Sequence, residues 1–226
     1  MSLLNKSSLA QTIDNVNNAL FYGKKITKKE AGEVIDWVSS RLDTEFSYNK
    51  SFGVTRHDMK SPVYTFTGER LSSPTSMRHI MAEEASRILI QLSKTAGRKV
   101  KALESSNREF MKALKRWEDD GKLAGTYCCG PCTVGLWRHL NVGGLPKYNK
   151  NLPEGIKVLH DMHDGAGRWG RFPFFYTLLA LSEIDHPLAQ KEINYAMPEC
   201  ERIFNRLNKK NKFSKRKRDL LMRVMA

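Results

Sequence analysis

Three of the four cysteines lie within five residues, and two of them belong to the motif Cys129-Gly130-Pro131-Cys132. A thiolate at the start of a helix is stabilised by free backbone amides and by the helix dipole, which lowers its pKa and makes it a better nucleophile and metal ligand. Proline suits the first turn of a helix, so the motif is expected at a helix start. Three interpretations stay open for Cys128, Cys129 and Cys132: a redox dithiol, a metal site, or thiols packed in the core.

A second segment with residues suited to chemistry reads HDMHD over residues 160–164. The imidazoles of His160 and His163 would lie one turn apart on a helix, where they could bind a metal ion. The carboxylate of Asp164 could orient one of the rings. The alternative is the polar end of a helix, where histidine and aspartate serve solvation and capping.

The cysteine and histidine motifs would form one site if the chain stacks helical hairpins in parallel register. Two thiols and two imidazoles are a zinc ligand set, so zinc is the cofactor that this hypothesis names. Trp169 and Tyr176 would then wall a ligand cleft beside the site. The candidate metal ligands are Cys129, Cys132, His160 and His163, and the candidate catalytic residues are these four and Asp164.

One predicted helix carries a dense group of polar residues, Arg78, His79, Glu83, Glu84 and Arg87. Two pairs in this group are four residues apart, the spacing at which opposite charges stabilise a solvated helix face. We therefore predict a solvated face. The alternative is a buried acid–base site, which requires a pocket around these side chains.

Apolar residues recur at spacings of three and four through most of the chain, which is typical of amphipathic helices. A capping box at Thr27–Glu30, a serine–proline start at 73–74 and a glycine at 97 mark predicted helix ends. The first two helices, within residues 9–42, are expected to form a hairpin. No segment alternates strand, helix and strand, so the predicted fold class is all-α.

Residues 44–72 lack this periodicity and are expected to form a long ordered loop, in which residues 63–67 are a candidate short strand. Further along, Asp120-Gly121 and Asp164-Gly165 each follow an apolar helix and precede a short link, a proline and a new apolar helix. The two Asp-Gly pairs lie 44 residues apart, and a period of this length is typical of stacked helical hairpins. We therefore predict helical hairpin repeats in the second half of the chain.

The segment 155–159 followed by Asp164-Gly165-Ala166-Gly167-Arg168-Trp169 resembles the helix and DG-x-W-type turn in the α/α toroids of terpenoid cyclases and protein prenyltransferases. The resemblance covers residues 105–200, and it implies a hairpin stack that forms part of an α/α toroid. The Asp-rich protonation motif of the cyclases has no counterpart here. The zinc-binding Asp, Cys and His of the prenyltransferases do not map onto this chain, so the resemblance bears on fold and not on catalysis.

The composition, 40% hydrophobic and 27% charged over 226 residues, is ordinary for a globular protein. No apolar run is long enough for a membrane helix, the first ten residues lack signal-peptide order, and the clustered cysteines do not suit a secreted disulfide framework. We therefore expect a cytoplasmic protein. The predicted organisation is one helical domain over 1–208, with a sub-boundary allowed at 44–72, and a basic tail with a short helix over 209–226.

The formal net charge is +14, and residues 201–226 contribute +8 of it. Such a basic block can bind nucleic acid or anionic lipid, or it can be a solvated end. The excess is concentrated in residues 209–218, where a single phenylalanine, Phe213, offers little surface for base stacking. The candidate nucleic-acid-binding residues are Lys209, Lys210, Lys212, Lys215, Arg216, Lys217 and Arg218.

Three functional hypotheses follow. The first is a helical-repeat scaffold that binds a partner protein or an apolar ligand, because no complete catalytic set is apparent. The second is a metal- or thiol-dependent enzyme that acts on a hydrophobic substrate through the cysteine and histidine motifs. The third is a nucleic-acid-associated protein that uses the basic C-terminal segment. The sequence leaves open whether the chain is an enzyme.

Overall fold

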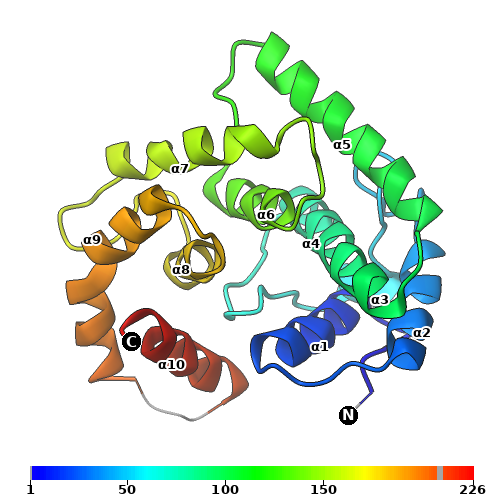
Figure 1. Cartoon of the computed structure of the whole chain (residues 1–226), viewed down its shortest axis with the longest axis horizontal. Coiled ribbons are helices and arrows are strands. Elements are labelled where there is room, and N and C mark those ends of the chain that lie inside the picture. Colours follow the sequence, from blue (N-terminus) through cyan, green and yellow to red (C-terminus); the bar gives the residue numbers. More distant parts are fainter. Residues whose placement is uncertain (1, 208–210) are drawn as a thin grey trace.

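The computed structural model describes residues 2–207 and 211–226, and over this part of the chain it is all-α, as the sequence predicts (Figure 1). The described residues contain no β-sheet, only three isolated β-bridges. The helices are α1 (Leu9–Phe21), α2 (Lys28–Ser39), α3 (Arg56–Lys60), α4 (Pro74–Ala96), α5 (Lys101–Asp119), α6 (Gly130–Asn141), the 3-10 helix η1 (Asn149–Asn151), α7 (Leu152–Asp161), α8 (Phe174–Glu183), α9 (Pro187–Phe204) and α10 (Lys212–Val224).

The predicted helix ends are confirmed at α2 and α4. Thr27 and Glu30 form a reciprocal capping box at the start of α2, which satisfies two backbone amides that the helix leaves free. Ser73 accepts a hydrogen bond from the Ser76 amide at the start of α4, with proline in the first turn. Gly97 ends α4 with a φ of 68°, a left-handed conformation that glycine adopts without steric strain.

Helix α4 lies at the centre of the N-terminal half and packs against α1, α2, α5 and α6. The predicted hairpin within residues 9–42 is wrong, because α1 and α2 each pack extensively against α4 and not against one another. The apolar stripes of both helices are buried, as at Val16 of α1 and Val34 of α2. Each of the two helices thus packs on the long helix α4, which is buried on most sides, and not on its neighbour in sequence.

Five helices form a closed ring, and α5, α7 and α9 lie outside it (Figure 1). Around this ring α1 packs on α4, α4 on α6, α6 on α8 and α8 on α10. Side chains close the circle between α10 and α1, where Arg216 pairs with Asp14 at 2.6 Å and the Tyr22 hydroxyl donates to Asp219 at 2.7 Å. This ring positions the polar groups described below.

Residues 44–72 form the predicted ordered loop, which also contains the short helix α3. The candidate strand at 63–67 does not extend beyond one isolated bridge, between Tyr64 and Arg70, because no neighbouring strand is available to pair with it. The loop crosses the inside of the ring (Figure 1), where Phe66 packs on Phe21 with a ring-centroid distance of 5.2 Å.

The two Asp-Gly turns differ in geometry. Asp120 directly ends α5, and Gly121 follows with a φ of 72°. Asp164 lies three residues beyond the end of α7, where its carboxylate accepts hydrogen bonds from the amides of Ala166 and Arg168. Two turns of the same sequence therefore end their helices in different ways, and the helical repeat stays a prediction.

The basic C-terminal segment is joined to the ring through α10, whose Leu220 and Leu221 are fully buried. Lys209 and Lys210 lie outside the described residues. Within the described residues, no helix combines the length and the apolar character that crossing a bilayer requires.

Candidate functional site

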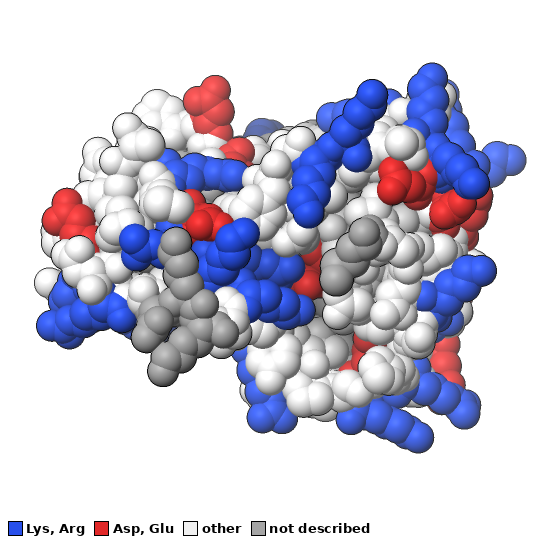
Figure 2. Space-filling model, turned by 90° about the horizontal axis from the view of Figure 1, so that it is seen from below, with Lys and Arg blue, Asp and Glu red and all other residues white. Residues whose placement is uncertain are grey.

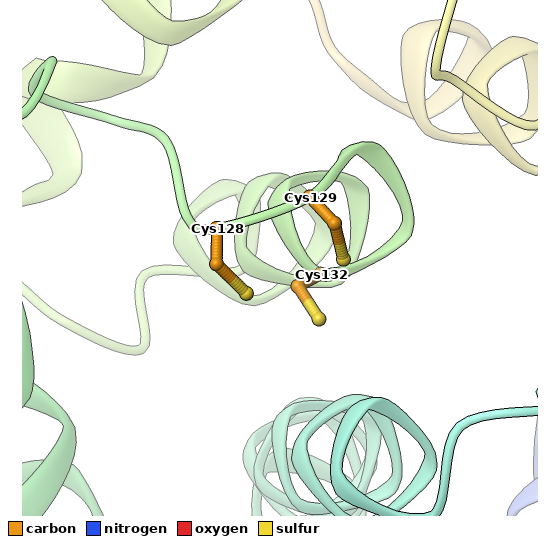
Figure 3. Close-up of side chains that lie close together, drawn as sticks. All are labelled: Cys128, Cys129 and Cys132. Atoms are coloured by element: carbon orange, nitrogen blue, oxygen red, sulfur yellow. The ribbon is translucent and has the colours of Figure 1, made fainter.

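The three clustered cysteines converge at the start of α6. Cys129 is the N-cap of the helix, and the sulfur atoms of Cys128, Cys129 and Cys132 all lie within 4.8 Å of one another. Figure 3 shows the three side chains directed to the same side of α6. Cys128 is exposed, Cys129 is partly buried and Cys132 is buried, so the group spans the boundary between solvent and core.

Local packing fixes the conformation of this segment. A Cβ atom at Gly130 would lie 2.0 Å from the carbonyl oxygen of Arg171, so only glycine allows the chain after the second Asp-Gly turn to pass so close to α6. The preceding loop is held by the Tyr127 amide, which donates to the Thr133 hydroxyl at 2.9 Å, and by Trp137, which donates to the Gly125 carbonyl at 2.8 Å. The thiols are thus attached to a rigid support.

The three thiols differ in acidity because they hydrogen-bond to one another. The Cys132 thiol donates to Cys129 and is the main cause that lowers the pKa of Cys129 to about 5, and the Ser76 hydroxyl contributes in the same direction. The same hydrogen bond, followed by burial, raises the pKa of Cys132. Burial, followed by the nearby charge of Cys129, raises the pKa of Cys128. Cys129 is therefore the most acidic of the three thiols.

The geometry suits two kinds of thiol chemistry. In a tetrahedral zinc site with Zn–S bonds of about 2.3 Å, sulfur atoms are about 3.8 Å apart, so three thiols within 4.8 Å need only small rotations to share one ion. A nucleophilic thiolate at a helix start beside a buried thiol is also the arrangement of a redox dithiol.

The histidine motif lies elsewhere. The group of three thiols includes no imidazole from the described part of the chain. His160 is largely exposed, and His163 pairs with Glu192 at 2.7 Å and stacks on Tyr195 with a ring-centroid distance of 3.4 Å. Asp164 caps its own turn, and the amides of Arg168 and Ala166 lower the pKa of its carboxyl. The structure therefore does not bring Cys129 and Cys132 together with His160 and His163.

The two residues expected to wall a cleft are buried and hydrogen-bonded. Trp169 donates to Glu192 at 2.8 Å, close to His163, and is 3% exposed. Tyr176 donates to Glu84 at 2.7 Å in the interior of the ring. Trp169 thus belongs to the surroundings of the histidine motif, whereas Tyr176 belongs to a separate polar network.

The solvated face predicted for α4 is wrong, because His79, Glu83, Glu84 and Arg87 are all buried. Helices α1, α2, α5 and α6 pack around α4, so the polar side chains find partners on other elements. Glu83 contacts His139 of α6 at 2.5 Å and His79 at 3.5 Å. Burial alone would raise the pKa of Glu83, but the two imidazoles together lower it.

A second group of charges, built on the adjacent residues Glu84 and Arg138, joins three ring helices. Arg138 of α6 pairs with both Glu84 of α4 and Glu183 of α8. Arg87 pairs with Glu183 at 3.0 Å and donates to Asn17 of α1 at 2.8 Å. Burial opposes the charge on Arg138, but Glu183 and Glu84 raise its pKa well above the ordinary value.

Sequence reasoning missed this network. Arg138 and Glu183 stand within apolar helices, at CTVGLWRHL and FFYTLLALSE, and a charge on a buried helix face is the signal that could have found them. Their partners on α4 are 54 and 96 residues away in sequence, for Arg138–Glu84 and Arg87–Glu183 respectively, so the pairing itself is a tertiary property.

The basic candidates on α10 have different surroundings. Arg216 is buried against Asp14, and Lys212 pairs with the same carboxylate at 3.2 Å, so both charges are engaged within the chain. Lys215, Lys217 and Arg218 each lie over an aromatic ring. Lys and Arg side chains gather near the middle of the face seen in Figure 2. A nucleic-acid interface on this face stays a prediction.

No protein family, no characterised protein sequence and no solved structure matches this chain.

Proposed function

We propose that this protein binds one thiophilic metal ion, such as zinc, through the sulfur atoms of Cys128, Cys129 and Cys132. The observation that carries the proposal is the convergence of three thiols within 4.8 Å on the rigid start of α6. Thiolates are the preferred protein ligands of such ions, and the helix dipole favours the negative charge that the ligands bring.

The third thiol favours a metal over a simple dithiol. A disulfide uses two sulfur atoms, and Cys129 and Cys132 alone would supply them. Cys128 adds a third sulfur on the exposed side of the same group. Three protein ligands leave a fourth tetrahedral position for water or substrate, which is the pattern of catalytic zinc sites and not of closed structural ones. The proposal thus develops the hypothesis of a metal-dependent enzyme, with a ligand set that omits the histidines.

A redox dithiol is the second candidate. The low pKa of Cys129, caused mainly by the Cys132 thiol, together with the burial of Cys132, suits attack on a substrate disulfide followed by resolution through Cys132. Cys128 has no role in this chemistry. A Cys128→Ser variant therefore separates the two candidates.

The broader fold hypothesis also stays a proposal. The closed ring, with further helices outside it, is an arrangement in which alternate helices form an inner and an outer layer. This alternation supports the α/α-toroid resemblance that the Asp-Gly turns suggest.

The test is a titration of the reduced full-length chain with zinc against a competing chromophoric chelator. Wild type and the control variant Cys200→Ser, whose thiol is buried in α9, should each take up one equivalent. Cys128→Ser should lose stoichiometric binding. Unchanged binding by Cys128→Ser would overturn the three-thiol proposal, and in that case an oxidised Cys129–Cys132 disulfide, identified by peptide mapping, would favour the dithiol.

A further inference from the structure

The ring of helices lines a second polar feature, a half-open cavity of about 310 Å³ that is separate from the thiol group. Every ring helix contributes to it, for example Asn17 from α1, Arg87 from α4, Asn141 from α6, Ser182 from α8 and Arg223 from α10. This volume falls at the lower end of the range for small-molecule sites. A cavity to which five helices contribute is a consequence of ring closure.

Positive charge predominates on the cavity wall. Arg87, Arg138 and Arg223 line it, against the single carboxylate of Glu183. Glu183, together with the buried Glu84 behind the wall, already pairs with Arg87 and Arg138. Arg223 is exposed at the edge, donates to the Phe21 carbonyl at 2.7 Å, and forms no ion pair with a carboxylate of the described chain. An anion placed here would therefore meet a cationic group that is not yet neutralised.

Two residues that line the cavity also carry buried polar atoms without a hydrogen-bond partner in the described part of the chain. Arg87 is 5% exposed, yet its Nε atom has no hydrogen-bond partner within the described residues. The buried Oε1 atom of Gln91, which also lines the cavity, is likewise without a partner there. Leaving a buried donor or acceptor unpaired is unfavourable, so two such atoms beside one cavity favour a polar ligand there.

The remaining wall is apolar. Phe21 and Phe66 form one side, and Leu179 of α8 lies on another. An inorganic anion would leave these surfaces in contact with water. We infer that the cavity binds a small organic anion, in which a carboxylate or phosphate group meets Arg223 and Arg87 and an apolar body packs on Phe21 and Phe66.

The inference does not depend on the metal proposal. The thiols lie at the start of α6, and the cavity is lined by Arg138, Asn141 and Val142 at the end of the same helix. The two sites therefore occupy opposite ends of α6, and a ligand in the cavity would not contact the sulfur atoms.

Isothermal titration of the full-length chain with phenyl phosphate tests the inference, because this probe combines a small aromatic body with a dianion. Wild type should bind one equivalent, and benzyl alcohol, the uncharged comparison, should bind at least tenfold more weakly. Arg223→Gln should weaken phenyl phosphate binding about tenfold, the equivalent of 1.4 kcal/mol. Arg223→Lys should retain most of the affinity because it keeps the charge.

The matched control is Arg108→Gln, which removes the same charge from an exposed position of α5 outside the cavity. Its affinity should equal that of wild type, and thermal melts should show that all three variants are folded. If Arg108→Gln and Arg223→Gln lost the same affinity for phenyl phosphate, the overall charge of the protein would explain the effect, and the proposed site would be overturned. Failure of wild type to bind phenyl phosphate, or equal binding of benzyl alcohol, would also overturn it.

Discussion

Arg138 and Glu183 face each other in a two-point contact, in which the Nε and Nη2 atoms of the arginine each lie 2.9 Å from a carboxylate oxygen. The contact joins α6 to α8 inside the ring. Planar, two-point pairing between arginine and carboxylate is strong and geometrically specific, so it fixes the relative register of the two helices. The cavity described above depends on this register.

Glu183→Gln should lower the free energy of unfolding by about 2 kcal/mol, because it leaves Arg87 and Arg138 buried without one of their counter-ions. This value is below the range for a fully buried pair, since the Glu183 side chain is 21% exposed. Urea denaturation measures the change. The control Glu154→Gln, which removes an exposed pair with Lys157, should change stability by less than about 1 kcal/mol.

The same pair should make stability depend on pH. Burial would raise the pKa of Glu183, but Arg138 and Arg87 lower it in the folded state. A carboxyl whose pKa is lower in the folded than in the unfolded protein stabilises the folded state. This stabilisation is complete above the unfolded-state pKa and is lost as the pH falls through the folded-state pKa. The stability difference between wild type and Glu183→Gln should therefore shrink as the pH is lowered from about 7 to about 3. A difference that stays constant over this range would show that the charge of Glu183 is not what stabilises the contact.

Gly155→Ala should destabilise the protein by about 3 kcal/mol, because the added Cβ would lie 2.3 Å from the Gly125 carbonyl oxygen and 2.6 Å from Trp137 Nε1. The matched control is Gly32→Ala, also inside a helix but with open space around the new methyl group. Gly32→Ala should raise the free energy of unfolding by up to about 1 kcal/mol, because alanine has the higher helix propensity. Thermal denaturation compares the two, and equal effects would contradict the close packing of the 125 loop on α7.

Cys129 of the reduced, metal-free protein should be alkylated by iodoacetamide with a half-maximal rate near pH 5, since the thiolate is the reacting form. Cys132→Ala removes the main hydrogen bond that stabilises this thiolate, so the half-maximal rate should move up towards about pH 8.5. Peptide mass spectrometry reads the rate at each cysteine separately. A pH profile of Cys129 that is the same in both proteins would show that Cys132 does not control its acidity.

Much of the fold could be predicted from local signals. The capping box at Thr27, the serine and proline before α4 and the glycine at 97 each act within one helical turn, so the sequence specifies them directly. The expected hairpin of α1 and α2 failed because periodicity identifies an apolar face but does not say which helix covers it. The prediction of a solvated face on α4 failed for a related reason, because Glu84 and Arg87 find their partners on α6 and α8, far away in sequence.

The candidate site was predicted only in part. The position of Cys129 at a helix start could be predicted from the residues that follow it, because glycine and proline form the first turn of α6. The convergence of the sulfur atoms also follows from short spacing. The predicted participation of His160 and His163 required a contact across 28 or more residues. The chain after the second Asp-Gly turn does pass the start of α6 at Arg171, but it brings no imidazole of the described residues to the three thiols.

X-ray absorption at the zinc edge tests the metal proposal most directly, because it counts the sulfur ligands of the bound ion. The sample is the reduced full-length chain loaded with one equivalent of zinc. We expect three sulfur scatterers at about 2.3 Å and one lighter ligand from water or buffer. A shell of two or fewer sulfur atoms, or the outer-shell pattern of coordinated imidazole, would contradict a centre built from Cys128, Cys129 and Cys132.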